Sequence, residues 1–505
     1  MFDQQRQTGK LTILLLALAA CLFAQPNANG QVVVALGEPT EVKDVLTFNI
    51  KLHPAPEPVP AFKYRLTVLP HDTIPANAAT LYLRSFGESS LSGPLRAAEK
   101  KFGFEEFHSW HDDETPIDSL PLEDVRAAMA YFDHYIDNHI ARATRCRDCD
   151  WDYGEEDLES TEVFSFLLPS MQQTRSISRV LSVRTRFAIA EKRFDDAVAS
   201  MRMNYQLGQN VSKLKILVCD LIGLAEIGIT NKNMLDFIAA PDSPNMYWAL
   251  TELRRPIIST RDSIRLESQS GSRIITQLKD AQTASHSEEE WGHMAREATK
   301  SCFLAHRLAY GHYGEASDEE DIETKADLAA TGFGLLGYTA AKKRLIAAGT
   351  DAQAVEKMAV GQVLLIDASR EYQKLANEME KTSYLPFPEA RKLRDKNRKL
   401  FRSFQPSSPG SVIAEMLLPA IEQVHTAQHR VQRDIDSMRV IEAIRMHAAK
   451  TGELPASLDD ISVVPVPQNP MTGKSFVYQF ENGAATLILP KSDGAGLEKR
   501  FVLEL

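Results

Sequence analysis

Apolar residues recur at intervals of three and four through residues 172–253, the most strongly patterned part of the chain. The first run consists of Ile177, Val180, Leu181, Phe187 and Ala188. The second run consists of Phe194, Ala197, Val198, Met201 and Tyr205. This spacing places each set on one face of an α-helix. Because only residues 191–193 separate the two runs, the pattern predicts antiparallel helices that share their apolar faces.

A third helix is predicted over residues 213–230, and it is apolar nearly all round. Lys215, Asp220 and Glu226 interrupt it. A membrane-spanning helix needs about 20 predominantly apolar residues. The interrupted pattern therefore indicates a buried helix, with Leu217, Leu221 and Leu224 in the core of the protein.

Helical periodicity is also found on both sides of this central stretch. The predicted helices cover residues 94–101, 122–144, 244–253, 257–280, 288–310, 325–348 and 352–381. Thr350 and Gln353 resemble a capping box at the start of the last of these helices. The proline-containing residues 385–388 end it.

Near the C-terminus the period changes from 3.6 to 2. Residues 405–410 form a Pro/Ser/Gly linker, and a long helix is predicted over residues 419–450. Two alternating segments, 475–480 and 484–489, then flank Asn482-Gly483, which is a strong hairpin signal. Residues 499–505 are expected to add a third strand. A small hairpin needs a helix to cover its apolar face, so it should pack on the inner face of the long helix. The residues expected to meet there are Phe476, Tyr478, Leu487, Leu489, Ile435, Met438 and Ile441.

The N-terminal residues are typical of an exported protein. Arg6 and Lys10 precede the apolar run 11–20, which suits a signal peptide better than a membrane span. Residues 18–21 resemble a lipobox that would lipidate Cys21, and cleavage after residues 28–30 is the alternative. The chain is thus divided into a signal segment (1–30), an extended Pro-rich arm (31–60), a helical body (61–404), a linker (405–410) and a C-terminal module (411–505).

The predicted fold class is mainly α. It combines a helical-hairpin, α-solenoid-like body with a small C-terminal α+β module made of a long helix and an antiparallel hairpin. The 505 residues can bury a large core, and the formal net charge of −11 argues against nucleic acid as a partner.

Cys146 and Cys149 form the most distinctive short motif, Cys-Arg-Asp-Cys. A redox dithiol needs a helix N-terminus behind it, whereas this pair follows a predicted helix and Asp148 would raise the thiol pKa. A zinc site needs a second pair of ligands, and the chain has no second CxxC. Two interpretations stay open, a local disulfide or two unreactive thiols.

His425 and His429 lie four residues apart on the long predicted helix, so both can face one side, as metal ligands do. No third ligand is evident, and the pattern favours an exposed polar face. His108 and His111, near Asp112 and Asp113, form a second His/Asp group, which is common in surface loops.

Two further groups carry charge near the predicted helices. The residues around Trp291 do not match the zinc-protease motif H-E-x-x-H, and the chain has neither a G-x-S-x-G elbow nor a Walker glycine loop. An arginine row on the first central helix comprises Arg175, Arg179, Arg184 and Arg186. The row could bind an anion, but a solvated face paired with Asp195 and Asp196 is favoured.

Several segments resemble an uncharacterised family of exported, mainly helical planctomycetal proteins. They are residues 61–69, 149–151, 244–253, 358–363, 384–391, 440–449 and 464–478. The resemblance implies an exported helical protein and assigns no catalytic residue. Phe194, Ala197, Met201 and Leu207 also resemble one degenerate tetratricopeptide repeat. Residues 451–455 and 469–473 resemble the helix-to-sheet joint of type II secretion pseudopilins.

The leading functional expectation is a non-catalytic binding or scaffold protein of the cell envelope, with a protein or peptide as its partner on a helical-hairpin surface. The alternative is a hydrolase-like envelope enzyme with a site assembled across helices, and a third is a structural protein anchored through Cys21. Clustered ionisable side chains with shifted pKa values would favour the enzyme, and a groove with exposed aromatic residues would favour binding. No cofactor, metal ligand or catalytic residue is predicted.

Overall fold

The computed structural model describes residues 45–86, 92–111, 115–152, 160–274, 285–310, 328, 331–332, 337–403, 409–491 and 497–505. Several predicted features lie wholly or partly outside these residues. They include the signal segment with Cys21, residues 31–44 of the arm, Asp112 and Asp113, residues 405–408 of the linker, and parts of the predicted helices 257–280 and 325–348.

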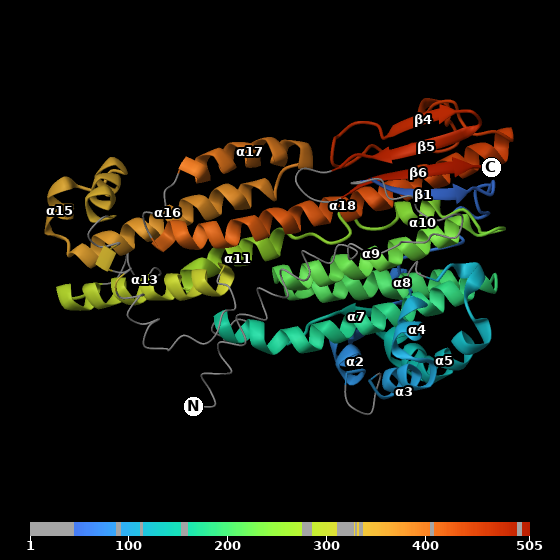
Figure 1. Cartoon of the computed structure of the whole chain (residues 1–505), viewed down its shortest axis with the longest axis horizontal. Coiled ribbons are helices and arrows are strands. Elements are labelled where there is room, and N and C mark those ends of the chain that lie inside the picture. Colours follow the sequence, from blue (N-terminus) through green and yellow to red (C-terminus); the bar gives the residue numbers. More distant parts are fainter. Residues whose placement is uncertain are drawn as a thin grey trace.

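The helices lie in two layers along the long axis of the molecule (Figure 1). One layer contains α7 (Ser160–Ala190), α8 (Phe194–Val211) and α9 (Leu217–Ala239), which pack on one another. The other layer contains α16 (Val360–Thr382) and α18 (Pro409–Thr451). Helix α9 also packs on α18 and so joins the layers. The predicted mainly helical fold is confirmed.

The second helix of the central hairpin begins where the apolar pattern predicts, whereas the first, α7, begins at Ser160, before the predicted stretch that starts at residue 172. Helix α8 covers residues 194–211, and Lys192 in the preceding turn has a φ of 57°. Leu217, Leu221 and Leu224 are all buried on α9, as predicted. Their helix continues nine residues beyond the predicted end, to Ala239, because residues 231–239 are also mostly buried.

Gly208 on α8 and Gly223 on α9 bring these two helices into backbone contact. A Cβ added at Gly223 would lie 2.4 Å from the carbonyl oxygen of Gly208, and one added at Gly208 would lie 2.7 Å from that of Gly223. No real Cβ approaches so closely. The crossing therefore requires glycine at both positions.

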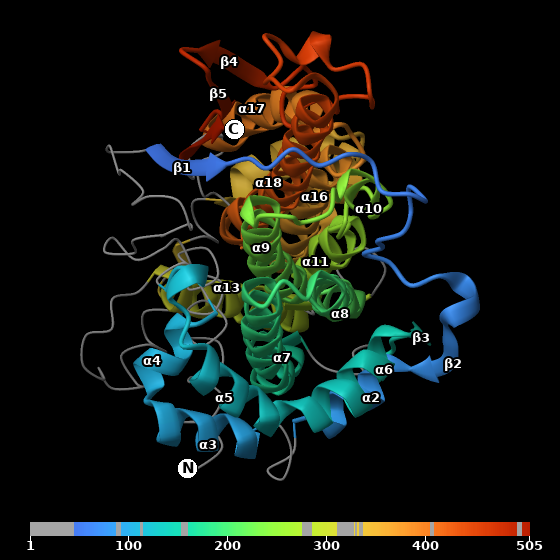
Figure 2. The same ribbon diagram turned by 90° about the vertical axis from the view of Figure 1, so that its right-hand side faces the viewer.

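A group of shorter elements packs beside α7, at the bottom of Figure 2. It contains β2 (Ile74–Asn77), α2 (Ala78–Arg84), α3 (Ser92–Phe102), α4 (Phe104–Ser109), α5 (Leu122–Tyr135), the π-helical turn η3 (Ile136–Ile140), α6 (Ala141–Thr144) and β3 (Cys146–Asp148). The predicted helix 122–144 is confirmed as the continuous run α5–η3–α6. The 3-10 turns are η1 (Pro70–Asp72), η2 (Ile117–Ser119), η4 (Ser212–Leu214) and η5 (Leu458–Asp460).

The segments between α9 and α18 differ in detail from the prediction. The helices here are α10 (Tyr247–Thr251), α11 (Arg261–Ile274), α13 (Glu288–Tyr310), α15 (Ala352–Lys357) and α17 (Phe387–Ser403). The predicted single helix 352–381 is broken at Met358 and Ala359, both of which have extended backbone. The predicted capping box is wrong, because the Asp351 side chain accepts the Ala354 N–H instead. Helix α17 was not predicted.

The C-terminal strands form a four-stranded sheet in the order β1-β6-β5-β4. Strands β4 (Val477–Glu481), β5 (Ala484–Leu489) and β6 (Glu498–Glu504) are antiparallel, which confirms the hairpin and the third strand. Asn482 and Gly483 have φ values of 53° and 83°, as a type I′ turn requires. The residues expected to meet across the sheet and α18 belong to one core cluster, with Tyr478 at its margin.

The fourth strand of this sheet comes from the predicted N-terminal arm. Strand β1 (Val45–Lys51) pairs in parallel with β6, and Phe48 stacks on Phe501 with ring centroids 5.2 Å apart. After β1 the chain crosses α10 and α18 before it descends to β2 (Figure 2). The division of the chain into arm, body and module stays a prediction about folding units. The arm and the module share one sheet, and all three parts contribute to one core cluster.

Among the described residues, no helix is both long enough and apolar enough to cross a membrane.

Candidate functional site

One face of α18 carries a row of polar side chains that are largely buried. They are His425, Gln428, His429, Gln432, Asp436 and Arg439. Five of the six follow one another at intervals of four and three residues, so they lie on one face of the helix. Ile435, Met438 and Ile441 lie in the core. A polar row that is buried and not solvated is the first sign of a site on this helix.

Four members of the row, His429, Gln432, Asp436 and Arg439, form one wall of a pocket with a volume of about 520 Å³. This volume is within the range of small-molecule sites. Arg255 and Pro256 form the second wall, and residues 465–470 form the third. The third wall is mostly apolar, because Pro465, Val466, Pro467 and Pro470 line it beside the single polar residue Gln468. Three segments that are far apart in the sequence therefore meet here.

Two guanidinium groups share one carboxylate in this pocket. Arg439 Nη1 donates to Asp436 Oδ1 at 3.0 Å, and Arg255 Nη2 contacts the same oxygen. Asp436 is 4% exposed, whereas Arg255 is 45% exposed and reaches it from the rim. Burial lowers the pKa of both arginines, and the charge of Arg439 lowers that of Arg255 further.

Arg439 is held more firmly than Arg255. Its Nε donates to Thr251 Oγ1 at 2.9 Å, and its guanidinium carbon lies 5.3 Å from the centre of the Tyr247 ring. Arg439 is therefore a fixed cation in the pocket, and Arg255 is the exposed one.

The two histidines lie between α18 and α17, so the expectation of an exposed polar face is wrong. His425 is 2% exposed, and the His429 ring packs against Phe387 in a tilted arrangement with ring centroids 4.8 Å apart. Burial lowers the pKa of His425 to about 3, with smaller contributions from His429 and Arg394. Burial, assisted by Arg394, lowers that of His429 to about 4. Both rings are therefore neutral at neutral pH.

Side-chain nitrogens link the two rings to Gln428. Gln428 Oε1 accepts the N–H and the hydroxyl of Thr260, which turns its amide nitrogen towards His429 Nε2 at 3.4 Å. His429 Nε2 also lies 3.3 Å from His425 Nε2. His425 Nδ1 is buried and has no hydrogen-bond partner among the described residues.

The spacing of His425 and His429 also suits a metal, but the surroundings do not. Nearby Arg394 and Arg261 are cations that oppose a bound metal ion. Among the described residues, no three His, Cys, Asp or Glu side chains form a group that could hold one. The arrangement therefore favours a neutral hydrogen-bonded pair.

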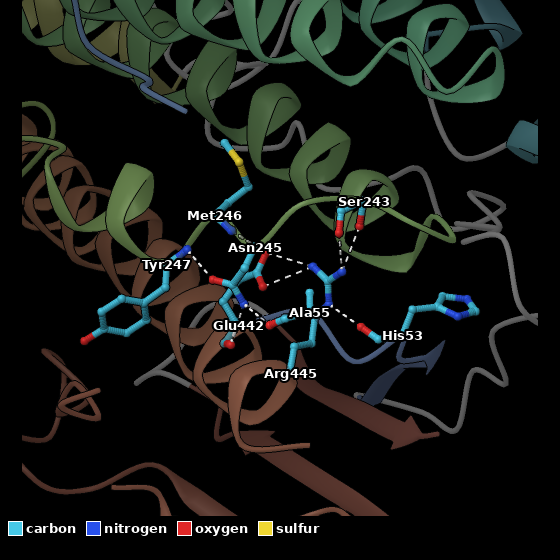
Figure 3. A network of polar contacts seen from close by, with 8 residues as sticks. All are labelled: His53, Ala55, Ser243, Asn245, Met246, Tyr247, Glu442 and Arg445. Atoms are coloured by element: carbon cyan, nitrogen blue, oxygen red, sulfur yellow. Dashed lines mark hydrogen bonds and ion pairs between the residues drawn. The ribbon is translucent and has the colours of Figure 1, made fainter. Parts of the chain in front are cut away.

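A buried ion pair supports the pocket from the next turn of α18 (Figure 3). Arg445 Nη1 donates to both Glu442 oxygens at 3.1 Å, and its Nη2 donates to the Ser243 carbonyl and hydroxyl at 2.8 and 2.9 Å. Its Nε donates to the His53 carbonyl at 2.9 Å. All five N–H groups of this fully buried guanidinium are satisfied, so the group joins the arm, the 243–247 turn and α18 without binding a ligand.

The same network positions the apolar wall. Glu442 Oε1 accepts the Met246 N–H at 3.1 Å, and Asn245 Nδ2 donates to the Glu442 carbonyl at 2.9 Å (Figure 3). Tyr247, which follows, donates its hydroxyl to the Pro465 carbonyl. The loop 465–470 is thereby tied to α10 and α18.

Cys146 and Cys149 are free thiols in the structure, the second of the two interpretations. Cys146 Sγ faces the Arg142 carbonyl and Cys149 Sγ faces that of Asn210, at 3.5 and 3.8 Å. Burial raises the pKa of Cys146, and it raises that of Cys149 to about 12. Two buried thiols of raised pKa are unreactive.

The remaining predicted groups are separate from the pocket. His108 pairs with Glu99 at 2.9 Å, and His111 is held by the His108 carbonyl. The buried Trp291 packs against the His286 ring at the start of α13, with ring centroids 4.8 Å apart. Neither group forms a metal site among the described residues.

The solvated face expected on α7 is wrong for Arg186, and the expected partners are wrong for Arg184. Arg186 is 1% exposed and pairs with buried Asp236 at 3.1 Å. Arg184 pairs with Asp137 of η3 at 3.0 Å, not with Asp195 or Asp196. These arginines join α7 to neighbouring elements because α7 is covered on both sides.

No protein-family model, curated protein or solved structure matches the chain.

Proposed function

We propose that the chain is an exported, non-catalytic binding protein and that the pocket between α18, Arg255-Pro256 and residues 465–470 is its ligand site. The observation that carries the proposal is the pair of arginines held on one buried carboxylate beside an apolar wall. A few fixed polar groups in a largely apolar pocket are typical of ligand sites. The signal-like N-terminus supports export.

The pocket has clustered ionisable groups with shifted pKa values, which is also the criterion for an enzyme. Their chemistry nevertheless favours binding. The described residues that line the pocket include no Ser, Thr, Cys, Lys or Glu. Asp436 is already paired with two arginines, and neither guanidinium can lose its proton near neutral pH. A nucleophile with an adjacent base, as covalent catalysis needs, is therefore not assembled here.

The proposal can be tested by filling the pocket. Val466→Trp places an indole in the apolar wall, and Val477→Trp is the matched control on strand β4, where Val477 is 45% exposed. Wild-type protein and both variants serve as bait in cell-envelope extract, and mass spectrometry identifies what is retained. We expect one set of partners to be retained by wild type and Val477→Trp and lost by Val466→Trp.

Retention of the same partners by all three proteins would place binding elsewhere on the surface. Chemical conversion of a retained molecule by wild type, and not by Val466→Trp, would replace the proposal with the enzyme alternative.

A further inference from the structure

The pocket is short of one negative charge. Arg255 and Arg439 contribute two positive charges and Asp436 contributes one negative charge, so the net charge is +1 with His429 neutral. Both guanidinium groups lie on the same oxygen, Asp436 Oδ1. Two like charges that share one carboxylate oxygen repel each other, and a second anion between them would relieve that repulsion.

The other polar groups refine the choice of anion. His429 also lines the pocket, as a neutral ring at neutral pH. Gln432 donates to Asp436 Oδ2 at 3.4 Å, and its own Oε1 is buried and has no hydrogen-bond partner among the described residues. An unpaired acceptor beside two guanidinium donors suits a ligand that carries an N–H group next to its anion.

A deficit of one charge fits a carboxylate better than a phosphate dianion, and a planar guanidinium matches a carboxylate in two parallel hydrogen bonds. The wall of Pro465, Val466, Pro467 and Pro470 offers an apolar surface to a neighbouring side chain. On the basis of the proposed function, we infer that the ligand is a peptide carboxylate, bound between Arg255 and Arg439 with its adjacent amide N–H on Gln432 and its side chain on the proline wall.

A peptide carboxylate has two sources, the chain terminus and an acidic side chain. Four pools of N-acetylated tripeptides separate them: free acids and C-terminal amides, each prepared with and without Asp and Glu. Each pool is equilibrated with the full chain at low salt, and the retained peptides are identified by mass spectrometry. The C-terminal amides without Asp or Glu are the pool that lacks a carboxylate. We expect peptides with a free C-terminal acid, or peptides with an acidic side chain, to be retained at least tenfold more than this pool.

Two neighbouring arginines provide a matched comparison. Arg255 lines the pocket, whereas the neighbouring Arg254 is also exposed and does not line it. Arg255→Gln should weaken binding of the best retained peptide at least tenfold and flatten its salt dependence, and Arg254→Gln should leave both unchanged. Acetate should compete with the peptide better than inorganic phosphate at equal ionic strength.

Two results would overturn the inference. Equal retention of carboxylate-containing and carboxylate-free peptides, with loss of both in Val466→Trp, would keep the pocket as the ligand site and refute the carboxylate. The second result combines both experiments. If the protein retains none of the peptide pools, and Val466→Trp still retains the envelope partners, then both the ligand class and the site are refuted.

Discussion

Glu226 is fully buried on α9, where the Thr174 hydroxyl and the Arg175 charge of α7 only partly offset its burial. Burial raises its pKa to about 8, from 4.5. The unfolded chain therefore loses this proton near pH 4.5, whereas the folded protein keeps it to about pH 8. Between these values folding takes up a proton, so the free energy of unfolding falls as pH rises and the contribution is lost by about pH 8.

The change Glu226→Gln keeps the size of the side chain but replaces the carboxyl group with an amide that does not titrate. We expect the fall in unfolding free energy between pH 6.5 and 8 to become shallower by up to about 1.4 kcal/mol per pH unit. Urea unfolding followed by circular dichroism measures this slope, and Glu453→Gln at an exposed position is the control. An unchanged slope in Glu226→Gln would mean that the folded protein holds this carboxyl ionised.

The buried histidines change the unfolding free energy with pH in the opposite direction to Glu226, and they do so in a lower pH range. His425 and His429 have pKa values lowered from 6.5 to about 3 and 4. The unfolded chain gains these protons below pH 6.5 while the folded protein stays neutral, so stability falls as pH falls from 6.5 towards 4. The effect of Glu226 on the unfolding free energy is therefore measured above pH 6.5, and the effect of His425 and His429 is measured below it.

The crossing of α8 and α9 depends on the absence of side chains at one point. Gly223→Ala would drive its Cβ into the Gly208 carbonyl and should cost about 1–3 kcal/mol of unfolding free energy through overpacking. Gly228 lies on the same helix and has no atom within 4 Å of an added Cβ. Gly228→Ala should therefore be neutral or stabilising by up to about 1 kcal/mol, because alanine favours helix.

Chemical denaturation of both variants tests this prediction about α9. Equal losses in Gly223→Ala and Gly228→Ala would show that helix propensity, and not the backbone contact, controls the crossing.

The arm, the 243–247 turn and α18 are held together by Arg445 and Glu442, both 0% exposed (Figure 3). Arg445→Met would leave Glu442 buried without its counter-charge and should cost about 3–5 kcal/mol. The double change Arg445→Met with Glu442→Leu should recover part of that loss, because the unpaired charge disappears with its partner. A double-mutant cycle by urea unfolding measures both values.

Hydrogen exchange shows whether this ion pair stabilises α18 alone or also holds the arm and residues 243–247 on α18. We expect amides beside His53 and in residues 243–247 to exchange faster in Arg445→Met, since both segments lose a bond to the guanidinium. Faster exchange confined to α18 would contradict the joining role.

Local patterns alone account for several elements of this protein. The apolar spacing of residues 194–211 and the tight turn before them predict α8 and its hairpin with α7, because helical periodicity depends only on neighbours along the chain. Asn482-Gly483 predicts its turn for the same reason, since positive φ is a property of these residue types. The buried α9 follows from an apolar pattern that leaves no solvated face.

Tertiary structure decided the rest, and above all the pocket. His425 and His429 resemble an exposed polar face until α17 covers them with Phe387, and Arg186 resembles a surface residue until Asp236 pairs with it. Strand β1 joins β6 across almost the whole chain, and the pocket joins three segments that share no local pattern. Burial and charge pairing depend on which surfaces meet, and that choice is made by packing over the whole core, not by the spacing of residues within any one segment.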